Sequence, residues 1–333
     1  MKRVDRRGFL KAVGVGVGSF AFGTRRASAA AGAKVARLAA AAAPGGAQSK
    51  SFEDFAKYVA DKAKGELTIQ IFTGGQLGAE RDMVESVQMG SIEIGVFGAY
   101  VLSNVTPEWG APLDVPYAIR SQEHLRKVLD GPLAKPMYDA MLQRKGIRHI
   151  AWGNRGPRHL TSNKPINSPA DLKGVKIRVP EVETYVAAWK MLGATVTPMA
   201  VTEMFMGLKQ GTIDAQENPL ELIYTFSLNE VQKYVNLTAH IYSDWEITVS
   251  ERWFKSLSPD LQKVVYEGLV EMGKAESRYQ AADEAELERK LKEKGMIFNP
   301  VDLSKFREPL KDLPNQFKAK WKPGFFEEVV AAL

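Results

Sequence analysis

The first third of the chain alternates between two hydrophobic patterns. Short apolar runs rich in β-branched residues are followed by stretches in which apolar residues recur every three or four positions. The first pattern predicts strands and the second predicts amphipathic helices. This order is typical of an α/β fold with a largely parallel sheet. The strands are predicted at Val35–Ala39, Leu67–Phe72 and Ile92–Phe97, and the helices at Ser51–Gly65, with Ser51 as N-cap, and Glu80–Met89.

The middle of the chain predicts two crossings between lobes. The apolar run His149–Trp152 predicts a strand that continues into Gly153–Gly156, a crossover to a second α/β lobe. Trp245–Val249 predicts a strand that returns to the first lobe. Lobes connected in this way leave a cleft between them, and small ligands usually bind in such clefts. The predicted first lobe comprises residues 34–154 and 245–283, and the second comprises residues 155–244 and 284–333.

A long helical pattern follows the second crossing. Ser258 is a good N-cap, Pro259 suits the first helical position, and the apolar spacing continues through Leu291 until Gly295. At 1.5 Å per residue such a helix would be roughly 50 Å long, which exceeds one lobe. We therefore expect one helix that spans both lobes, the alternative being two ordinary helices with a break between them.

The first thirty residues have the pattern of an export signal. Arg6 and Arg7 precede Phe9-Leu10-Lys11 and an apolar stretch, and Ala27-Ser28-Ala29 offers a small-residue cleavage site near Ala29. The paired arginines favour a twin-arginine signal over an ordinary secretory one. The apolar stretch is too short and too rich in glycine to span a bilayer as a helix. Both alternatives predict a mature protein in the bacterial periplasm without stable membrane insertion.

Removal of this signal changes the charge balance. Residues 1–30 contain seven of the 45 Lys and Arg residues and one of the 39 Asp and Glu residues, so 38 of each remain. A nearly neutral mature protein gives no reason to expect nucleic acid or an anionic membrane surface as a partner. The chain has no cysteine, which excludes disulfides, thiolate nucleophiles and cysteine-ligated metals.

Two arginines stand beside glycine, proline and predicted strand residues. Arg158 lies in Gly156-Pro157-Arg158, and Arg178 lies in the short strand Lys176–Pro180. The planar guanidinium matches a carboxylate through two parallel hydrogen bonds. An arginine held on a strand therefore suits the binding of a small organic anion. The alternative is a surface arginine that flanks an edge strand, which is the more common situation for arginine in general.

The segment around these arginines resembles the solute-binding proteins of tripartite ATP-independent periplasmic (TRAP) transporters, the DctP-like family. Several pieces occur in the family's order and spacing, and together they are more specific than any one of them. The resemblance extends from about Lys34 to the C-terminus and is weakest in the last roughly thirty residues. The matching pieces are GPRHLTSNKPI (Gly156–Ile166), DLKGVKIRVP (Asp171–Pro180), GATVTPMAVTEMF (Gly193–Phe205), GTIDAQENP (Gly211–Pro219) and EVQKYVNLTAH (Glu230–His240).

The resemblance implies a two-lobe periplasmic binding protein with a central cleft and a long C-terminal helix that spans both lobes. It also implies roles for three residues. Arg178 is expected to pair bidentately with the ligand carboxylate, Arg158 to make a second charge-assisted contact, and Asn218 to orient the ligand through its amide. Pro219 disfavours a helical conformation at Asn218. Glu217 is expected to be a structural acid paired with an arginine, because an unpaired Glu217 that faced the ligand carboxylate would repel it and so oppose Arg178.

Five further residues are weaker candidates for the cleft wall. Each lies near a predicted strand end or crossover, and for the aromatic residues and Gln76 ordinary packing is an equal alternative. Arg155 would either add a third cation near the cleft mouth or face solvent. These candidates are Gln76, Tyr100, Trp152, Arg155 and Trp245.

The sequence offers little support for an enzyme. The four histidines lack metal-ligand spacing, and there is no nucleophile elbow, P-loop or dinucleotide fingerprint. No cofactor or metal is expected. The leading hypothesis is a periplasmic receptor that closes around a small carboxylate, such as a sugar acid, hydroxy acid or dicarboxylate, and delivers it to membrane subunits of a TRAP transporter. The alternatives are an exported enzyme that acts on an acidic metabolite and a receptor that presents its ligand to a membrane kinase.

Overall fold

The computed structural model describes residues 33–332, so the predicted export signal lies outside the described residues. The strands are β1 Lys34–Ala40, β2 Leu67–Phe72, β3 Ile94–Gly98, β4 Ile147–Ser162, β5 Lys176–Val179, β6 Thr195–Pro198, β7 Ala215–Asn218, β8 Tyr234–Ser250 and β9 Ile297–Asn299. The α-helices are α1 Ala47–Lys62, α2 Glu80–Met89, α3 Tyr100–Val105, α4 Pro107–Gly110, α5 Gln122–Leu129, α6 Lys135–Lys145, α7 Glu183–Met191, α8 Val201–Gln210, α9 Leu220–Thr225, α10 Glu251–Lys255, α11 Pro259–Glu293, α12 Leu303–Arg307 and α13 Phe325–Ala331. Short 3₁₀ helices occur at η1 Ala111–Asp114, η2 Pro169–Leu172, η3 Leu228–Glu230, η4 Glu308–Leu310, η5 Leu313–Gln316 and η6 Lys318–Lys320.

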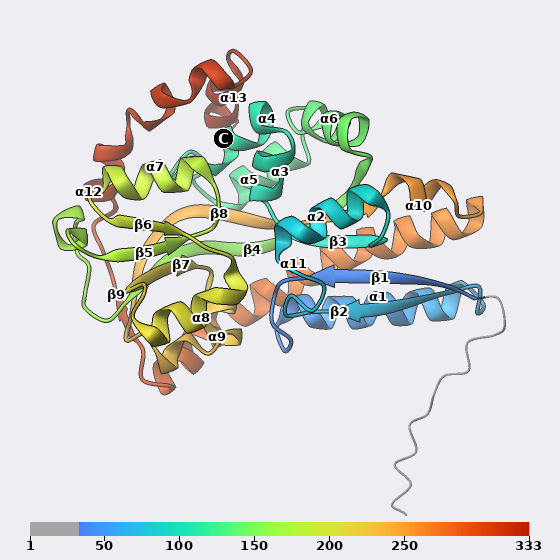
Figure 1. Ribbon diagram of the computed structural model, residues 1–333, viewed down its shortest axis with the longest axis horizontal. Helices are drawn as coiled ribbons and strands as arrows, with labels where there is room; N and C mark the ends of the chain where they lie inside the picture. The colour runs from blue at the N-terminus through green and yellow to red at the C-terminus, as the bar shows by residue number, and fades with distance from the viewer. Residues whose placement is uncertain (1–32, 333) are drawn as a thin grey trace, which may run out of the picture.

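A mixed sheet runs through both lobes in the order β2-β1-β3-β8-β4-β7-β5-β6, with β9 paired to β8. The outer strands of each lobe are parallel, whereas β8 is antiparallel to both β3 and β4. The two long strands β4 and β8 belong to both lobes and carry the chain between them (Figure 1). The predicted α/β fold with two lobes is confirmed, and the predicted crossings lie inside these two continuous strands.

The pairing of β4 with β8 is interrupted where the chain crosses between the lobes. Register shifts occur between His149 and Ala151, between Asn154 and Gly156, and between Arg158 and Leu160. Gly156 has φ +78°, a left-handed conformation that glycine adopts without a steric penalty. Irregularities of this kind bend a strand and increase its twist. The strand pair is therefore least regular at the crossover.

The long helix α11 lies along the crossing strands, as the sequence predicted. Its N-cap is Ser258, whose hydroxyl accepts a hydrogen bond from the backbone of Leu261, and the helix continues without a break to Glu293. Two glycines allow this close packing. A Cβ at Gly273 would lie 2.5 Å from the carbonyl oxygen of Trp152, and a Cβ at Gly153 would lie 1.8 Å from a carboxylate oxygen of Glu276.

Two details differ from the predicted elements. Helix α1 begins at Ala47, one turn before the predicted cap Ser51, whose buried hydroxyl instead donates to the carbonyl oxygen of Gln48. The C-terminal segment does not remain on the second lobe. Phe325 of α13 packs edge-on against Trp109 with ring centroids 5.0 Å apart, in the region assigned to the first lobe. The range 284–333 therefore contacts both lobes.

Candidate functional site

A cleft of about 1100 Å³ lies between the two lobes. One wall is formed by α2 and α3, which follow the carboxyl ends of β2 and β3. The other wall is formed by the carboxyl ends of β5 and β6 and by the helices α7 and α8 that follow them. Ligands of α/β proteins characteristically bind at the carboxyl ends of parallel strands. The cleft therefore occupies the position at which this architecture most often holds a small molecule.

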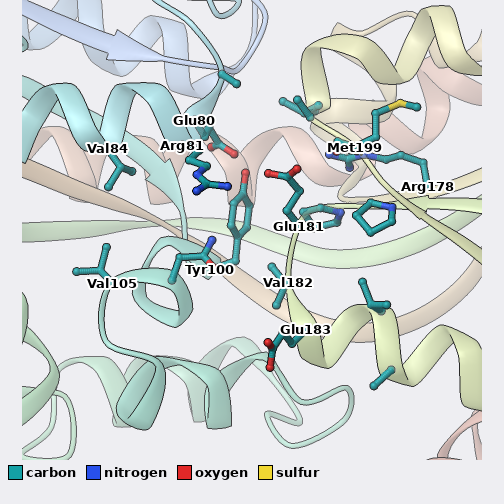
Figure 2. A pocket seen from close by; sticks show the side chains of 18 of the residues that line it. Glu80, Arg81, Val84, Tyr100, Val105, Arg178, Glu181, Val182, Glu183 and Met199 are labelled. Atoms are coloured by element: carbon teal, nitrogen blue, oxygen red, sulfur yellow. Dashed lines mark hydrogen bonds between the residues drawn. The ribbon is translucent and has the colours of Figure 1, made fainter.

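Arg178 lies on the second-lobe wall of this cleft. It is the third residue of β5, and its side chain is only 2% exposed. Its Nε donates to the carbonyl oxygen of Met199 at 2.8 Å, which fixes the plane of the guanidinium. Among the described residues, its two terminal nitrogens have no hydrogen-bond partner. Figure 2 shows the side chain at the cleft wall beside Met199. Such a group can bind a planar anion edge-on.

Arg158 lies on the same sheet but is already paired. Its Nε donates to Glu217 Oε2 at 2.5 Å, and its Nη2 donates to Glu217 Oε1 at 2.7 Å and to the Glu217 carbonyl oxygen at 2.7 Å. Nη2 also donates to Asn218 Oδ1 at 3.1 Å. His240 Nε2 lies 2.9 Å from the same carboxylate. Glu217 is therefore the structural partner of an arginine, which leaves only Nη1 of Arg158 without a partner among the described residues.

Because only Arg158 is paired with Glu217, the pKa values of the two arginines are shifted in opposite directions. Burial acts to lower the pKa of Arg158, but the charge and hydrogen bonds of Glu217 outweigh burial and raise that pKa above its ordinary value. Burial also raises the pKa of Glu217, but Arg158 and His240 outweigh this effect and lower it to about 2. For Arg178 burial prevails and lowers the pKa to about 10, with Glu217 compensating only in part. Unlike Arg158, Arg178 is thus a desolvated cation that lacks a matched anion.

Asn218 lies between the two arginines, on β7. Its Oδ1 accepts the bond from Arg158, and its Nδ2 donates to Gln216 Oε1 at 2.6 Å. The side chain is 1% exposed, and it belongs to the paired network rather than to the lining of the cleft as the structure describes it. The structure therefore brings Arg158, Asn218 and Arg178 to one edge of the sheet, but only Arg178 lines the cleft.

Arg155 and Trp245 form a separate contact beneath the cleft. The guanidinium carbon of Arg155 lies 3.8 Å from the centroid of the Trp245 ring, and both side chains are buried. Neither alternative predicted for Arg155, the cleft mouth or solvent, describes this position. Burial, followed by the charge of Arg158, lowers the pKa of Arg155 to about 10. A Cβ at Gly98 would lie 2.6 Å from its Nη1, so a larger residue there would require the side chain of Arg155 to move.

The remaining predicted candidates occupy different places. Tyr100 lines the cleft on the first-lobe wall (Figure 2). Gln76 is exposed in the turn after Gly74 and Gly75, and it is absent from the cleft lining in the described part of the chain. Trp152 donates through Nε1 to Asp130 Oδ1 at 2.8 Å on the outside of the first lobe. For Gln76 and Trp152 the structure thus offers no contact with the cleft.

One charged residue of the wall had not been expected. Glu80 begins α2, is only 7% exposed, and accepts a hydrogen bond through Oε1 from the backbone N–H of Gly98 at 3.0 Å. Burial raises its pKa, while Arg155 and the Gly98 bond act to lower it. An acid in the first turn of a helix ordinarily complements the helix dipole. The sequence therefore carried no signal that distinguished Glu80 from such an acid.

The histidines have structural contacts. His149 is hydrogen-bonded to Glu246, with its Nδ1 2.6 Å from Oε2 of that carboxyl group. Its ring also stacks on Tyr138 with ring centroids 3.6 Å apart. His124 Nε2 lies 2.7 Å from the carbonyl oxygen of Val329. Within residues 33–332, no group of His, Cys, Asp or Glu is arranged to hold a metal ion. In the same range no helix has the length and apolarity needed to cross a membrane.

Comparison with known proteins identifies relatives over most of the chain. Residues 38–320 match the family model described as bacterial extracellular solute-binding protein, family 7. A solute-binding protein of Roseobacter denitrificans is 38% identical over 258 residues, which cover 78% of this chain and 79% of that protein. The 2,3-diketo-L-gulonate-binding periplasmic protein of Escherichia coli is 32% identical over 264 residues, 79% of each chain.

Solved structures agree with this assignment. A TRAP periplasmic solute-binding protein of Roseobacter denitrificans with bound L-galactonate superposes with a TM-score of 0.84 at 34% identity, covering 90% of this chain and 98% of that one. A TRAP periplasmic solute-binding protein of a Polaromonas species bound to D-erythronate has a TM-score of 0.84 at 30% identity, with the same coverage of 90% and 98%.

Proposed function

Because the chain belongs to family 7 of the bacterial extracellular solute-binding proteins, we propose that it is the periplasmic receptor of a TRAP-type transporter and binds a small organic acid in its cleft. The resemblance predicted from the sequence is thereby confirmed at the level of the family. Its relatives include proteins whose bound or named ligands are sugar acids, among them L-galactonate, D-erythronate and 2,3-diketo-L-gulonate. Each of these ligands has one carboxylate and several oxygen atoms along a short carbon chain.

The observation that carries this proposal is the environment of Arg178. Its guanidinium is buried in the cleft wall, oriented by Met199, and free at its terminal nitrogens within the described structure. A carboxylate that forms two parallel bonds with it would restore the electrostatic partner that burial removes. Arg158 would contribute a single bond through Nη1, and Asn218 would hold Arg158 in place.

Closure of the lobes would complete the site. The cleft is open along its rim, and the irregular pairing of β4 with β8 near Gly156 offers a place for the strands to bend. We infer that the lobes, divided at this crossover as the sequence predicted, close by hinge motion and shield the ion pair from water. The closed form would then dock on the membrane subunits and release the acid to them.

A ligand screen with two variants tests the binding step. Sugar acids, hydroxy acids and dicarboxylates are screened by thermal shift, and hits are titrated by calorimetry. Arg178→Ala should weaken binding of the best acid by at least about 30-fold, since loss of one partner of a desolvated charge pair typically costs 2–5 kcal/mol. Lys190→Ala is the matched control, because Lys190 is an exposed cation on the same wall.

Two outcomes would reject the proposal. Unchanged affinity in Arg178→Ala would remove the proposed anion site. Chemical conversion of the acid, detected by chromatography after incubation with the protein, would indicate the exported enzyme instead of a receptor. Delivery is tested separately in vesicles that contain the membrane subunits, where uptake of the labelled acid should depend on added protein and should be lost with Arg178→Ala.

A further inference from the structure

The mouth of the cleft carries charged side chains of complementary sign on its two walls. Two cations and one acid line the mouth on the first lobe, and two acids and one cation line it on the second lobe. All six side chains are exposed or only partly buried. Opposite net charges on two facing walls attract each other as the walls approach. The residues are Arg81, Glu85 and Lys145 on the first lobe, and Glu181, Glu183 and Lys190 on the second.

Arg81 is poorly explained by the helix to which it belongs. It is the second residue of α2, and the positive end of the helix dipole disfavours a cation in the first turn. Its Nε lies 3.7 Å from Glu85 Oε1, and these side chains are 75% and 61% exposed. An ion pair with the cation four residues before the acid is the weaker of the two orientations on a helix. The helix therefore gains little from Arg81, whose side chain lines the cleft (Figure 2).

Glu181 is the corresponding acid on the second lobe. It is exposed, lines the cleft, and has no hydrogen-bond or ion-pair partner within residues 33–332. The other acid of this wall, Glu183, is already paired with Lys320 at 2.7 Å. Figure 2 shows the side chains of Arg81 and Glu181 extending into the cleft from its opposite walls. Arg81 and Glu181 are therefore the two opposite charges that the mouth leaves available to each other.

Glu181 belongs to the same short segment as the proposed anion-binding arginine. It lies three residues after Arg178, just beyond the end of β5. The backbone N–H of Val182 donates to the carbonyl oxygen of Pro180 at 2.8 Å, which places Glu181 at the centre of a tight turn. A rotation that brings an acid bound to Arg178 against the first lobe therefore carries Glu181 toward the beginning of α2, where Arg81 lies.

We propose that Arg81 and Glu181 form an ion pair across the mouth when the lobes close, and that this mouth pair slows release of the bound ligand. The inference rests on the proposed function, of which lobe closure is a part. In the open form both side chains are in water, where such charges contribute little. Closure removes water from around them and strengthens their attraction. Because the ligand leaves only through an open mouth, breaking the mouth pair becomes part of the barrier to dissociation.

Charge reversal with rescue tests the mouth pair. The probes are L-galactonate and D-erythronate, the acids bound by two of the solved relatives, and the dissociation rate is measured by stopped-flow tryptophan fluorescence. Arg81→Glu and Glu181→Arg should each raise that rate at least about fivefold, because each replaces an attraction by a repulsion. The double variant Arg81→Glu/Glu181→Arg restores opposite charges and should return the rate to within about twofold of the wild type.

Glu181→Arg is the decisive single variant. It adds positive charge beside a site for an anion, so a general electrostatic effect on the ligand would slow dissociation, whereas loss of the mouth pair speeds it. Glu85→Gln is the matched control on the same helix. It removes the partner that Arg81 has in the open protein but leaves Glu181 unchanged, so the dissociation rate should stay within about twofold of the wild type.

Disulfide trapping tests the same contact without a ligand. The chain has no cysteine, so Arg81→Cys/Glu181→Cys contains a single pair of thiols. A disulfide requires the two Cα atoms to approach within about 7 Å, which the closed form provides if the mouth pair exists. Oxidation by diamide, followed by mass spectrometry of the remaining thiols, should be at least about tenfold faster than in Glu85→Cys/Glu181→Cys, whose first thiol lies one turn further along α2.

The results separate failure of this inference from failure of the proposed function. Slower dissociation in Glu181→Arg, absence of rescue in the double reversal, or equal trapping rates for the two cysteine pairs would overturn the mouth pair and leave the receptor function standing. If no acid of the screen binds, the proposed function is wrong, and the trapping rates alone decide whether the two walls meet at Arg81 and Glu181. The trapping rates also decide if a reversal variant does not fold.

Discussion

The two arginines at the edge of the second-lobe sheet share a residue type and a depth of burial but differ in their partners. Arg158 is 1% exposed and holds Glu217 through three hydrogen bonds. Arg178 is 2% exposed and, apart from the bond of its Nε to Met199, has no hydrogen-bond partner among the described residues. Burial penalises both charges, but only for Arg158 does a carboxylate outweigh the penalty.

This difference distinguishes a structural arginine from a binding arginine. A buried cation with a matched anion stabilises the arrangement of strands around it, and its removal leaves an unpaired charge. A buried cation without an anion is held in place by the rest of the fold and gains most from an anion that arrives later. We therefore assign stability chiefly to Arg158 and affinity chiefly to Arg178.

The largest expected effect is on stability in Arg158→Met. This change leaves Glu217 buried with only His240 as a partner, and breaking a buried ion pair in this way typically costs about 3–5 kcal/mol. The free energy of unfolding, measured by urea denaturation monitored by circular dichroism, should fall by that amount. Lys190→Met, at an exposed position on the same lobe, should stay within about 0.5 kcal/mol of the wild type.

A second variant keeps this prediction decisive if Arg158→Met fails to fold. In Arg158→Met/Glu217→Leu both charges are replaced by apolar side chains, and much of the lost stability should return. A loss below about 1 kcal/mol in the single variant would contradict the structural role assigned to Arg158.

The next effect is the pH dependence of stability. Glu217 has a pKa of about 2 in the folded protein, below its ordinary value of 4.5, because Arg158 and His240 outweigh burial. A depressed pKa contributes stability that is present above pH 4.5 and is lost as pH falls toward 2. Urea denaturation across this range should show the loss, and Glu203→Gln, a change at an exposed acid, should leave the profile of the wild type intact.

Glu246 is expected to give a pH dependence of stability with the opposite sign. It contacts His149 but has no arginine partner in the described structure, and burial raises its pKa to about 8. The contribution of Glu246 to the free energy of unfolding is therefore complete below pH 4.5 and is lost as pH rises through about 8. The free energy of unfolding of the wild type should fall as pH rises through about 8, and Glu246→Gln should not show this fall. A wild-type profile without the fall, or a Glu246→Gln profile identical to the wild type, would show that this carboxyl group does not titrate as described.

The smallest expected effect belongs to Asn218→Ala. The change removes one acceptor of Arg158 and one donor to Gln216, both buried, so the free energy of unfolding should fall by about 1–3 kcal/mol. Affinity for the acid, measured by calorimetry, should fall by less than about tenfold, since Asn218 acts through Arg158. An affinity loss as large as that of Arg178→Ala, with stability unchanged, would move Asn218 from the paired network to the ligand.

The sequence was sufficient for the architecture because its signals are local. Ser258, Pro259 and Gly295 mark the two ends of the long helix, and the glycines at Gly153 and Gly156 mark the crossover. The pairing of Glu217 with an arginine also followed from electrostatics alone, because an unpaired carboxylate facing the ligand would repel the carboxylate that Arg178 is expected to bind. Prediction of these features required only the order of residues along the chain and the free-energy cost of burying a charge.

Other features of the cleft depended on contacts between distant segments. Trp152 and Trp245 each lie beside a crossing, and the pairing of β4 with β8 shifts register close to both of them. Arg155 meets Trp245 only because the two strands pair, and Glu80 meets Gly98 only because α2 packs beside β3. A period of two residues cannot predict the face of a side chain once a bulge shifts the register.

The most direct test of the central claim is a crystal structure of the protein with its tightest-binding acid. We predict that both oxygens of the ligand carboxylate lie within hydrogen-bond distance of the terminal nitrogens of Arg178, while Arg158 keeps its bonds to Glu217. A carboxylate bound instead to Arg155, or one that displaces Glu217 from Arg158, would contradict the account.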